Sequence, residues 1–236
     1  MEIKNSKLAW LNGFNLNRQK IITPQIYQFL QSAIVSVQLI PGEGLKEKEI
    51  IEYLGVSRTP IREAMLRLED EGLIDIYPQS GTYVSKIKIE SVKESQFIRE
   101  AMECAVVRYA AKYKTDQLIK KLSKKLHGYE DAMDSGDQER MFLMDEEFHR
   151  TLADFCFQPR LWRITNLAKS HMDRVRHLSL TITERQPKVL EEHKTIFKNI
   201  INSDQNQAEK SMREHLNYFI YDLKRIQSQK PEYFSN

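Results

Sequence analysis

The sequence predicts a mainly α-helical protein in which a winged helix-turn-helix precedes an all-helical bundle of about six helices. Of the 8 glycines, five fall within residues 42–81, and only Gly128 and Gly136 follow them. Glycine marks turns, so the first third of the chain is rich in turns and the remainder consists mostly of long helices. Residues 45–85 read as a helix, a tight turn, a second helix and a two-stranded hairpin, which is the order of a winged helix-turn-helix. We therefore divide the chain into an N-terminal arm, a winged domain, a helical domain and a C-terminal tail, at residues 1–22, 23–87, 90–228 and 229–236.

The composition is that of a soluble globular protein, with 41% hydrophobic and 29% charged residues. The net charge of +3 is too small to indicate nucleic-acid binding unless the positive charge is concentrated in one place. The two cysteines, Cys104 and Cys156, predict reduced buried thiols rather than a disulfide framework. The sequence has no apolar run near the ~20 residues that a membrane span needs, and its N-terminus lacks a secretory signal, so we expect a cytoplasmic protein.

The first helix of the winged domain is expected to begin with Thr23 as its N-cap and Pro24 at the first helical position. Apolar residues then recur at the spacing of a core-facing stripe until Pro41-Gly42 ends the helix. The arm before Thr23 shows no convincing period. It is either loose or packed on the second domain.

The helix-turn-helix itself is predicted from a short helix over 47–54, a turn at Gly55 and a second helix capped by Ser57. The second helix carries an i, i+3, i+4, i+7 apolar set that predicts its buried face: Ile61, Ala64, Met65 and Leu68. Residues 73–77 and 82–86 alternate well enough for two strands joined at Pro78-Gln79-Ser80-Gly81.

Arg58 and Arg62 are four residues apart and share a face other than the apolar one. They stand in the first turns of the second helix, the part of a recognition helix that reaches base edges, where arginine can bind guanine or phosphate. Ser57 and Thr59 can donate hydrogen bonds to phosphate. Gly81 at the tip of the wing lets the backbone approach a phosphate closely. The alternative is an ordinary solvated arginine pair, which the excess of acidic over basic residues between 42 and 72 favours.

Beyond Lys88 the apolar spacing predicts six helices, and no alternating strand pattern is present. Their approximate ranges are 90–113, 115–135, 137–156, 160–182, 185–202 and 204–228.

The helical domain contains a candidate metal site. Asp145 and His149 are four apart and face the same way on one helix. His193 and His215 lie on two later helices, placed symmetrically about a turn at Ser203-Asp204, so they are expected to be level with each other. Three imidazoles and one carboxylate suit Zn²⁺, Ni²⁺ or a similar ion. The histidines must be neutral to bind, so occupancy is expected to fall below about pH 6. The alternative is that each histidine is an isolated polar residue.

The string LGVSRTPIREAMLRLEDEGLI followed by PQSGTYV closely resembles the DNA-binding domain of the GntR family of bacterial transcription regulators, over roughly residues 24–86. The resemblance implies that Ser57, Arg58, Thr59 and Arg62 contact DNA from the recognition helix and that Gly81 does so from the wing. Lys48 stands where the family often has arginine. A lysine keeps the charge but loses the fork geometry of a guanidinium. Gln79 and Ser80 replace arginines that many relatives carry beside the wing glycine.

Residues of about 90–226, beginning FIREAMECAVVRYAA, resemble the FCD effector domain of the FadR subfamily. In metal-binding members the ligands match Asp145, His149, His193 and His215. The resemblance also implies a small carboxylate effector at or beside the metal, with Arg99 as a bidentate partner. The alternative for Arg99 is a salt bridge with Glu103, four residues on, at the helix surface.

Together these patterns predict a homodimeric, metabolite-responsive transcription regulator, most often a repressor in this family, that reads a pseudo-palindromic operator. Residues 86–90 are the expected hinge. One alternative is a metal-free regulator that senses a fatty-acyl thioester. A metal-dependent enzyme fused to a winged helix is the other, but the chain has no HExxH or paired-carboxylate pattern beside the metal ligands, so we expect no enzyme.

Overall fold

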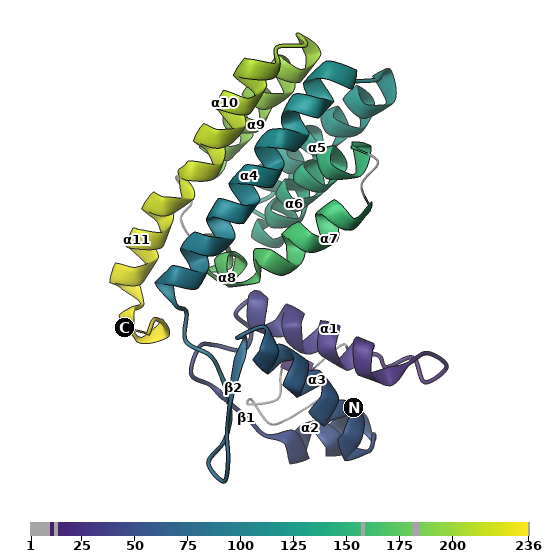
Figure 1. Cartoon of the computed structure of the whole chain (residues 1–236), viewed down its shortest axis with the longest axis vertical. Helices are drawn as coiled ribbons and strands as arrows, with labels where there is room; N and C mark the ends of the chain where they lie inside the picture. Colours follow the sequence, from purple (N-terminus) through teal and green to yellow (C-terminus); the bar gives the residue numbers. More distant parts are fainter. Residues whose placement is uncertain (1–9, 12–13, 157–158, 181–184, 236) are drawn as a thin grey trace. The chain divides into compact units, whose positions relative to one another are not determined.

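The structure is a computed structural model and describes residues 10–11, 14–156, 159–180 and 185–235. The chain forms two compact units (Figure 1). The first comprises Met1–Ile89 together with Lys230–Asn236, and the second is Glu90–Gln229. We describe each unit by itself.

The first unit is a winged helix-turn-helix. Its elements are α1 (Ile22–Val35), β1 (Gly44–Leu45), α2 (Glu47–Leu54), α3 (Arg58–Asp70), β2 (Ile74–Tyr77) and β3 (Gly81–Val84). The strands form an antiparallel sheet in the order β1-β3-β2, with Ile74 opposite Val84 and Tyr77 opposite Gly81. The sequence predicted the hairpin of β2 and β3 but missed β1, which is too short to show an alternating pattern.

The apolar faces of α1 and α3 make the core of this unit. Ile26, Leu30 and Ile34 from α1 are buried, as are the four α3 residues of the predicted apolar set. Burying one such side chain contributes roughly 1.5–3 kcal/mol to folding. The core therefore fixes which face of α3 is left for solvent.

The N-terminal arm packs on the first unit wherever the structure describes it. Leu11 is fully buried, and the Phe14 ring stacks on Phe29 of α1 at 4.0 Å between centroids. The Tyr53 hydroxyl donates a hydrogen bond to the Leu11 carbonyl at 3.2 Å. The arm is therefore neither loose at these positions nor part of the second unit. Residues 1–9, 12 and 13 of the predicted arm lie outside the described residues.

The start of α1 differs from the prediction. The helix begins one residue before Thr23, with Ile21 in the N-cap position. The Thr23 hydroxyl instead donates a hydrogen bond to the Glu63 carboxylate on α3, at 2.9 Å. Thr23 as the N-cap was therefore wrong, because the hydroxyl has a tertiary partner that the local sequence does not reveal.

The C-terminal segment returns to the first unit. After the 3₁₀ turn Pro231–Tyr233, Phe234 forms a parallel β-bridge with Ile87. The Ile87 N–H donates to the Tyr233 carbonyl at 2.8 Å, and the Ser235 N–H donates to the Ile87 carbonyl at 3.1 Å. Ile87 and Phe234 are both buried. Residues 229–236 were predicted to be a separate tail and 86–90 a hinge, whereas Ile87 and residues 233–235 are paired with each other.

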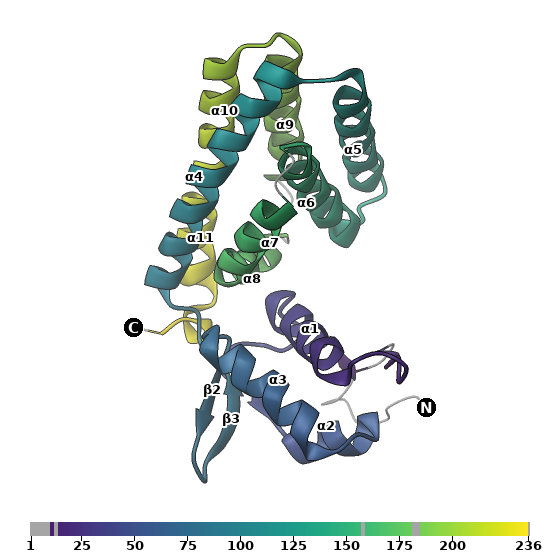
Figure 2. The same cartoon turned by 45° about the vertical axis from the view of Figure 1, so that its right-hand side comes forward.

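The second unit is all helical in its described residues (Figure 2). Its elements are α4 (Ile89–Tyr113), α5 (Asp116–Asp134), α6 (Gln138–Phe155), α7 (Pro159–Ala168), α8 (Ser170–Ser179), α9 (Gln186–Ile201), α10 (Gln205–Asn217) and α11 (Phe219–Gln229). In both views α4 runs beside α10, and the Gln96 amide donates to the Leu216 carbonyl at 2.9 Å. Helices α5, α6, α9 and α10 pack around a shared core of aliphatic side chains.

Two of the predicted helices are each divided in two. Helix 160–182 becomes α7 and α8, which meet at Lys169, and helix 204–228 becomes α10 and α11, which meet at Tyr218. Each break is one residue without glycine or proline, so the apolar spacing continues through it and gives no signal. Residues 181 and 182 of the prediction lie outside the described part.

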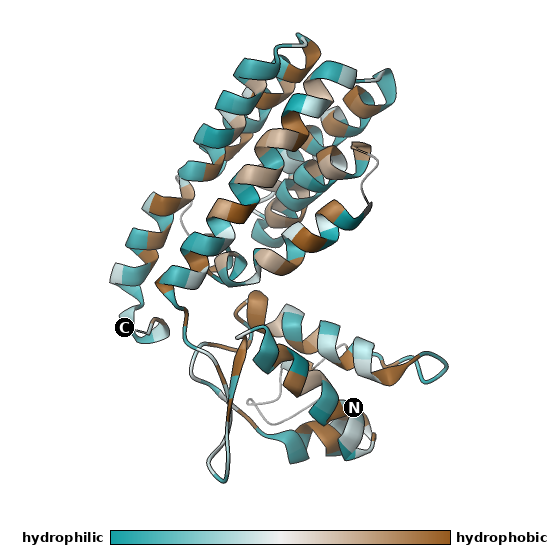
Figure 3. Cartoon of the chain, viewed as in Figure 1, coloured by the Kyte–Doolittle hydropathy of each residue, from teal (hydrophilic) through white to brown (hydrophobic). Residues whose placement is uncertain are grey.

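None of the helices in the described ranges is long and apolar enough to cross a membrane. In Figure 3 the hydropathy colours change repeatedly along the helices of both units. This pattern is that of amphipathic helices with one side in a core.

Candidate functional site

The N-terminal turns of α3 present the predicted DNA-contacting side chains to solvent. Ser57 occupies the N-cap position with an extended backbone, φ −71° and ψ 168°. Ser57, Thr59 and Arg62 are exposed, and the Arg58 side chain retains 71% of its accessible surface. Lys48 on α2 is exposed as well. The buried face of α3 points the other way, so these groups are free to meet a nucleic acid.

Arg58 has an intramolecular partner at this surface. Its Nε donates to the Glu47 carboxylate on α2, at 2.8 Å. An exposed ion pair of this kind contributes little, so a phosphate or a guanine can displace Glu47 from Arg58 at small cost. Glu47 therefore orients Arg58 without withdrawing it from the surface.

The wing ends in a turn that favours glycine. Gly81 has φ +123° and Gln79 has φ +63°. A Cβ on Gly81 would lie 3.5 Å or more from the Tyr83 ring, which is ordinary contact. The requirement for glycine at this position is therefore conformational rather than steric.

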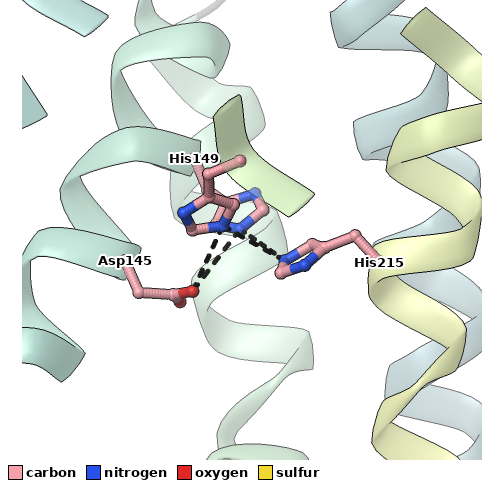
Figure 4. Close-up of side chains that lie close together, drawn as sticks. Asp145, His149 and His215 are labelled. Carbon is pink, nitrogen blue, oxygen red and sulfur yellow. Dashed lines mark hydrogen bonds and ion pairs between the residues drawn. The ribbon is translucent and has the colours of Figure 1, made fainter. Parts of the chain in front are cut away.

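The four candidate metal ligands converge in the second unit. Asp145 and His149 come from α6, His193 from α9 and His215 from α10, and one ligand atom of each lies within 4.8 Å of the others. Figure 4 shows Asp145, His149 and His215 pointing toward a common centre. All four residues are buried.

The inward atoms of the histidines are all Nε2. His215 Nε2 lies 3.3 Å from both His193 Nε2 and His149 Nε2. Asp145 Oδ1 is 3.4 Å from His193 Nε2 and 3.9 Å from His149 Nε2. The turn between α9 and α10, where the Asp204 carboxylate caps α10 by accepting from the Gln207 N–H, brings His193 and His215 level.

The surroundings of His193 and His215 favour neutral imidazoles, and those of Asp145 favour an ionised carboxylate. Burial lowers the pKa of His193 well below its ordinary value and lowers the pKa of His215 as well. Burial alone would raise the pKa of Asp145, but the nearby Arg176 guanidinium and the histidines outweigh it and hold that pKa below its ordinary value. These are the protonation states that metal binding requires.

A cavity of about 80 Å³ adjoins the cluster. Asp145 and His215 line it together with Arg99, Arg176 and Arg185. Arg99 has its Nε 2.6 Å from Glu103 Oε1, and both side chains are at least 90% buried. The salt bridge considered for Arg99 is therefore present, but it is internal rather than on the helix surface, and it coexists with a place in the cavity wall.

Sequence reasoning did not single out Arg176, Arg185 or Glu192. Arg176 donates to Asp145, Glu146 and Asp173. Arg185 makes a bidentate pair with Glu192 at 2.7 and 2.8 Å. The local signal is weak, because a charged helical residue usually faces solvent. Glu192 is adjacent to His193 in the sequence but contacts His215, which only the tertiary structure reveals.

Comparison with known proteins identifies both units. Residues 22–84 match the model described as "Bacterial regulatory proteins, gntR family", and residues 94–218 match the FCD domain. The HTH-type transcriptional repressor RspR of Escherichia coli (strain K12) is 34% identical over 220 residues, which cover 93% of this chain and 96% of RspR. An uncharacterized HTH-type transcriptional regulator of Streptomyces ambofaciens is 32% identical over 89% of this chain and 88% of its own.

A solved structure described as E. coli McbR/YncC shares the fold, with a TM-score of 0.76 and 22% identity over 87% of this chain and 98% of that one. A second, described as a putative transcriptional regulator GntR from Rhodococcus sp. RHA1, has a TM-score of 0.71 and 21% identity over 86% of this chain and 97% of that one.

The chain belongs to the GntR family of bacterial transcription regulators and carries an FCD domain. It is a DNA-binding transcriptional regulator, and the relatives with which it aligns are regulators and not enzymes.

Proposed function

We propose that the protein is a homodimeric repressor whose binding to a pseudo-palindromic operator is controlled by a small carboxylate held beside a divalent metal in the second unit. The observation that carries the proposal is the convergence of Asp145, His149, His193 and His215 next to an arginine-lined cavity. The relative RspR bears the name of a repressor, which supports that direction of control. Because the proposed repressor binds the DNA of a bacterial cell, we place it in the cytoplasm.

On the DNA side, the exposed groups at the start of α3 are the proposed contacts: Ser57, Arg58, Thr59 and Arg62. Arginine at such a position binds guanine O6 and N7 or a phosphate, and the hydroxyls donate to phosphate. Lys48 and the wing tip at Gly81 would add backbone contacts. A dimer would place two α3 helices on half-sites about a helical turn apart.

On the metal side, the donor set fits zinc or nickel. Imidazole nitrogens and one carboxylate suit these first-row ions, and the four donors are already close together in the buried interior. The ion would supply a fixed positive charge at the cavity wall, which favours an anionic ligand. Asp145, His149, His193 and His215 would hold it.

For the effector, the cavity favours a small anion. Its three arginines, with Ser179, Tyr129 and Gln186, offer the donors that a carboxylate or hydroxy acid needs. A cavity of about 150 Å³ accepts benzene, so the 80 Å³ present here suits a molecule of a few heavy atoms. This size disfavours the fatty-acyl thioester considered as an alternative.

The test combines metal analysis with DNA binding. Protein purified without a metal-affinity tag is expected to carry zinc or nickel, and the His193→Ala/His215→Ala double variant is expected to carry none. Genomic fragments selected by the metal-loaded protein would then be titrated in the presence of a panel of two- to six-carbon carboxylates. Selected fragments whose affinity is the same with and without metal, and with every carboxylate, would contradict the effector proposal.

A further inference from the structure

Two histidines of the cluster are held from outside by glutamates. His215 Nδ1 lies 2.7 Å from Glu192 Oε2, and His149 Nδ1 contacts Glu103 Oε2. These are the ring nitrogens that face away from the centre, since the Nε2 atoms of the same rings lie 3.3 Å apart inside it. Each ring therefore contacts a glutamate through Nδ1 and directs Nε2 toward the centre of the cluster.

An ionised carboxylate accepts hydrogen bonds but cannot donate them, so a carboxylate beside Nδ1 favours the tautomer that carries its proton there. The Nε2 of each such ring then carries a lone pair directed inward. Two such lone pairs 3.3 Å apart repel unless a cation or a proton lies between them. The outer carboxylates thus favour the tautomer that a metal ion needs.

The glutamates are themselves held by buried arginines. Arg99 Nε donates to Glu103 Oε1 at 2.6 Å, and Arg185 donates to both oxygens of Glu192. A guanidinium keeps its partner ionised and fixed in orientation. Both arginines also line the cavity beside the cluster. The structure therefore contains two chains of contacts, Arg99–Glu103–His149 and Arg185–Glu192–His215.

We propose that Glu103 and Glu192 are positioning residues of the metal centre, each fixing the tautomer and orientation of one histidine and each anchored by an arginine of the cavity wall. This inference rests on the metal site of the proposed function and adds residues to it that do not contact the ion. It assigns a role to the buried Glu103 and the half-buried Glu192.

The experiment replaces each glutamate by its amide. Glu103→Gln and Glu192→Gln are expected to weaken zinc affinity tenfold to a hundredfold, as measured by competition with a chromophoric chelator. The matched control is Glu209→Gln on α10, which loses an ion pair with Arg213 at 2.8 Å but touches neither outer nitrogen. The control is expected to bind zinc as the wild type does.

A second readout separates positioning from general loosening of the fold. Long-range ¹⁵N NMR of the histidine rings in the zinc-loaded protein reports which nitrogen carries the proton. In the wild type the rings of His149 and His215 are expected to be protonated at Nδ1. Each glutamate variant is expected to alter the signals of its own histidine and to leave the other histidine unchanged.

The outcomes are distinct. A wild-type protein that binds neither zinc nor nickel would overturn the metal proposal, and the positioning role with it. Wild-type binding with unchanged affinity and unchanged ring signals in the variants would overturn the positioning role alone. Glu103 is more deeply buried than Glu192, which is 27% exposed. If Glu103→Gln does not fold, the zinc affinity and ring signals of Glu192→Gln test the positioning role.

Discussion

At the scale of the residue, the side chains that define this regulator are of two kinds. The contacts proposed for DNA are exposed and weakly paired, as Arg58 is with Glu47. Those proposed for the metal and the effector are buried and paired several times over, as Arg176 is with Asp145, Glu146 and Asp173. Substitution is expected to affect binding alone in the first group, and both binding and folding in the second.

Arg62→Ala is expected to abolish specific operator binding without unfolding the protein. Loss of one bidentate arginine contact costs about 1–3 kcal/mol of binding free energy, or roughly tenfold to a hundredfold in affinity. A dimer with two copies would lose about twice that free energy, or roughly a hundredfold to ten-thousandfold in affinity. Fluorescence anisotropy at fixed salt measures the change. Arg150→Ala on α6 removes the same charge from an exposed site in the second unit and is expected to bind as the wild type does. Equal affinity of Arg62→Ala and wild type would contradict the assignment of α3.

His177 makes stability depend on acidity. Burial lowers its pKa to about 4, and its ring stacks on Phe142 at 3.9 Å. The unfolded chain, with a histidine pKa near 6.5, binds more protons than the folded protein between these values, so the free energy of unfolding falls as the pH drops from 6.5 to 4. The full effect is at most about 3–4 kcal/mol, at about 1.4 kcal/mol for each pKa unit between about 4 and 6.5.

His177→Phe retains an aromatic ring against Phe142 and removes the titration. Urea unfolding in the presence of a chelator, at pH 7 and at pH 4.5, measures the difference. The variant is expected to lose less stability than the wild type over this interval. An equal loss would show that other groups account for the dependence.

At the scale of the element, three helices carry the four proposed metal ligands, and α7 and α8 separate α6 from α9 in the sequence. A bound ion would therefore act as a clip between α6, α9 and α10. A ligand at a hundred times its dissociation constant stabilises the folded state by about 2.7 kcal/mol. Zinc is expected to slow amide exchange in these three helices and to leave α1 to α3 unchanged. Equal slowing in both units, or none in α9, would contradict the clip.

The elements that could be predicted from the sequence are those formed by interactions between residues close together in the chain. The run from Leu54 to Val84 encodes the turn and the hairpin in local residues, and the structure has both. Ser57 takes the predicted N-cap position, but its side chain makes no capping hydrogen bond. The convergence of His193 and His215 was readable because both lie near one tight turn. By contrast β1, the packing of Phe14 on Phe29 and the Arg185–Glu192 pair depend on partners that the local pattern does not identify. The breaks at Lys169 and Tyr218 have no local signal, since neither residue ends a helix by itself.

At the scale of the whole molecule, regulation requires that one ligand favours an arrangement of the winged units that DNA does not. The coupling is reciprocal, so an effector that weakens operator binding must itself bind more weakly in the presence of operator. Arg99 and Arg185 line the cavity proposed for the effector, and they pair with Glu103 and Glu192. These two glutamates in turn contact His149 and His215, two of the proposed metal ligands. Their affinities are therefore expected to depend on each other.

The pairing of Ile87 with Phe234 can be tested in the same framework. Phe234→Ala removes a side chain that is 6% exposed, and such truncations cost roughly 3 kcal/mol in a core. Faster amide exchange is expected at Ile87 and Ser235, whose N–H groups donate in this pairing. Ile220→Ala on α11 removes a 44% exposed apolar side chain and is the matched control. Unchanged exchange at Ile87 in Phe234→Ala would show that the backbone bonds do not depend on the ring.

The return of residues 230–235 to Ile87 means that the polypeptide passes between the two units twice, once on either side of the helical bundle in sequence. A single proteolytic cut near residue 88 would leave the units tethered through the other passage. During synthesis the entire second unit must leave the ribosome before the backbone pairing of Ile87 with residues 233–235 can close and complete the winged unit.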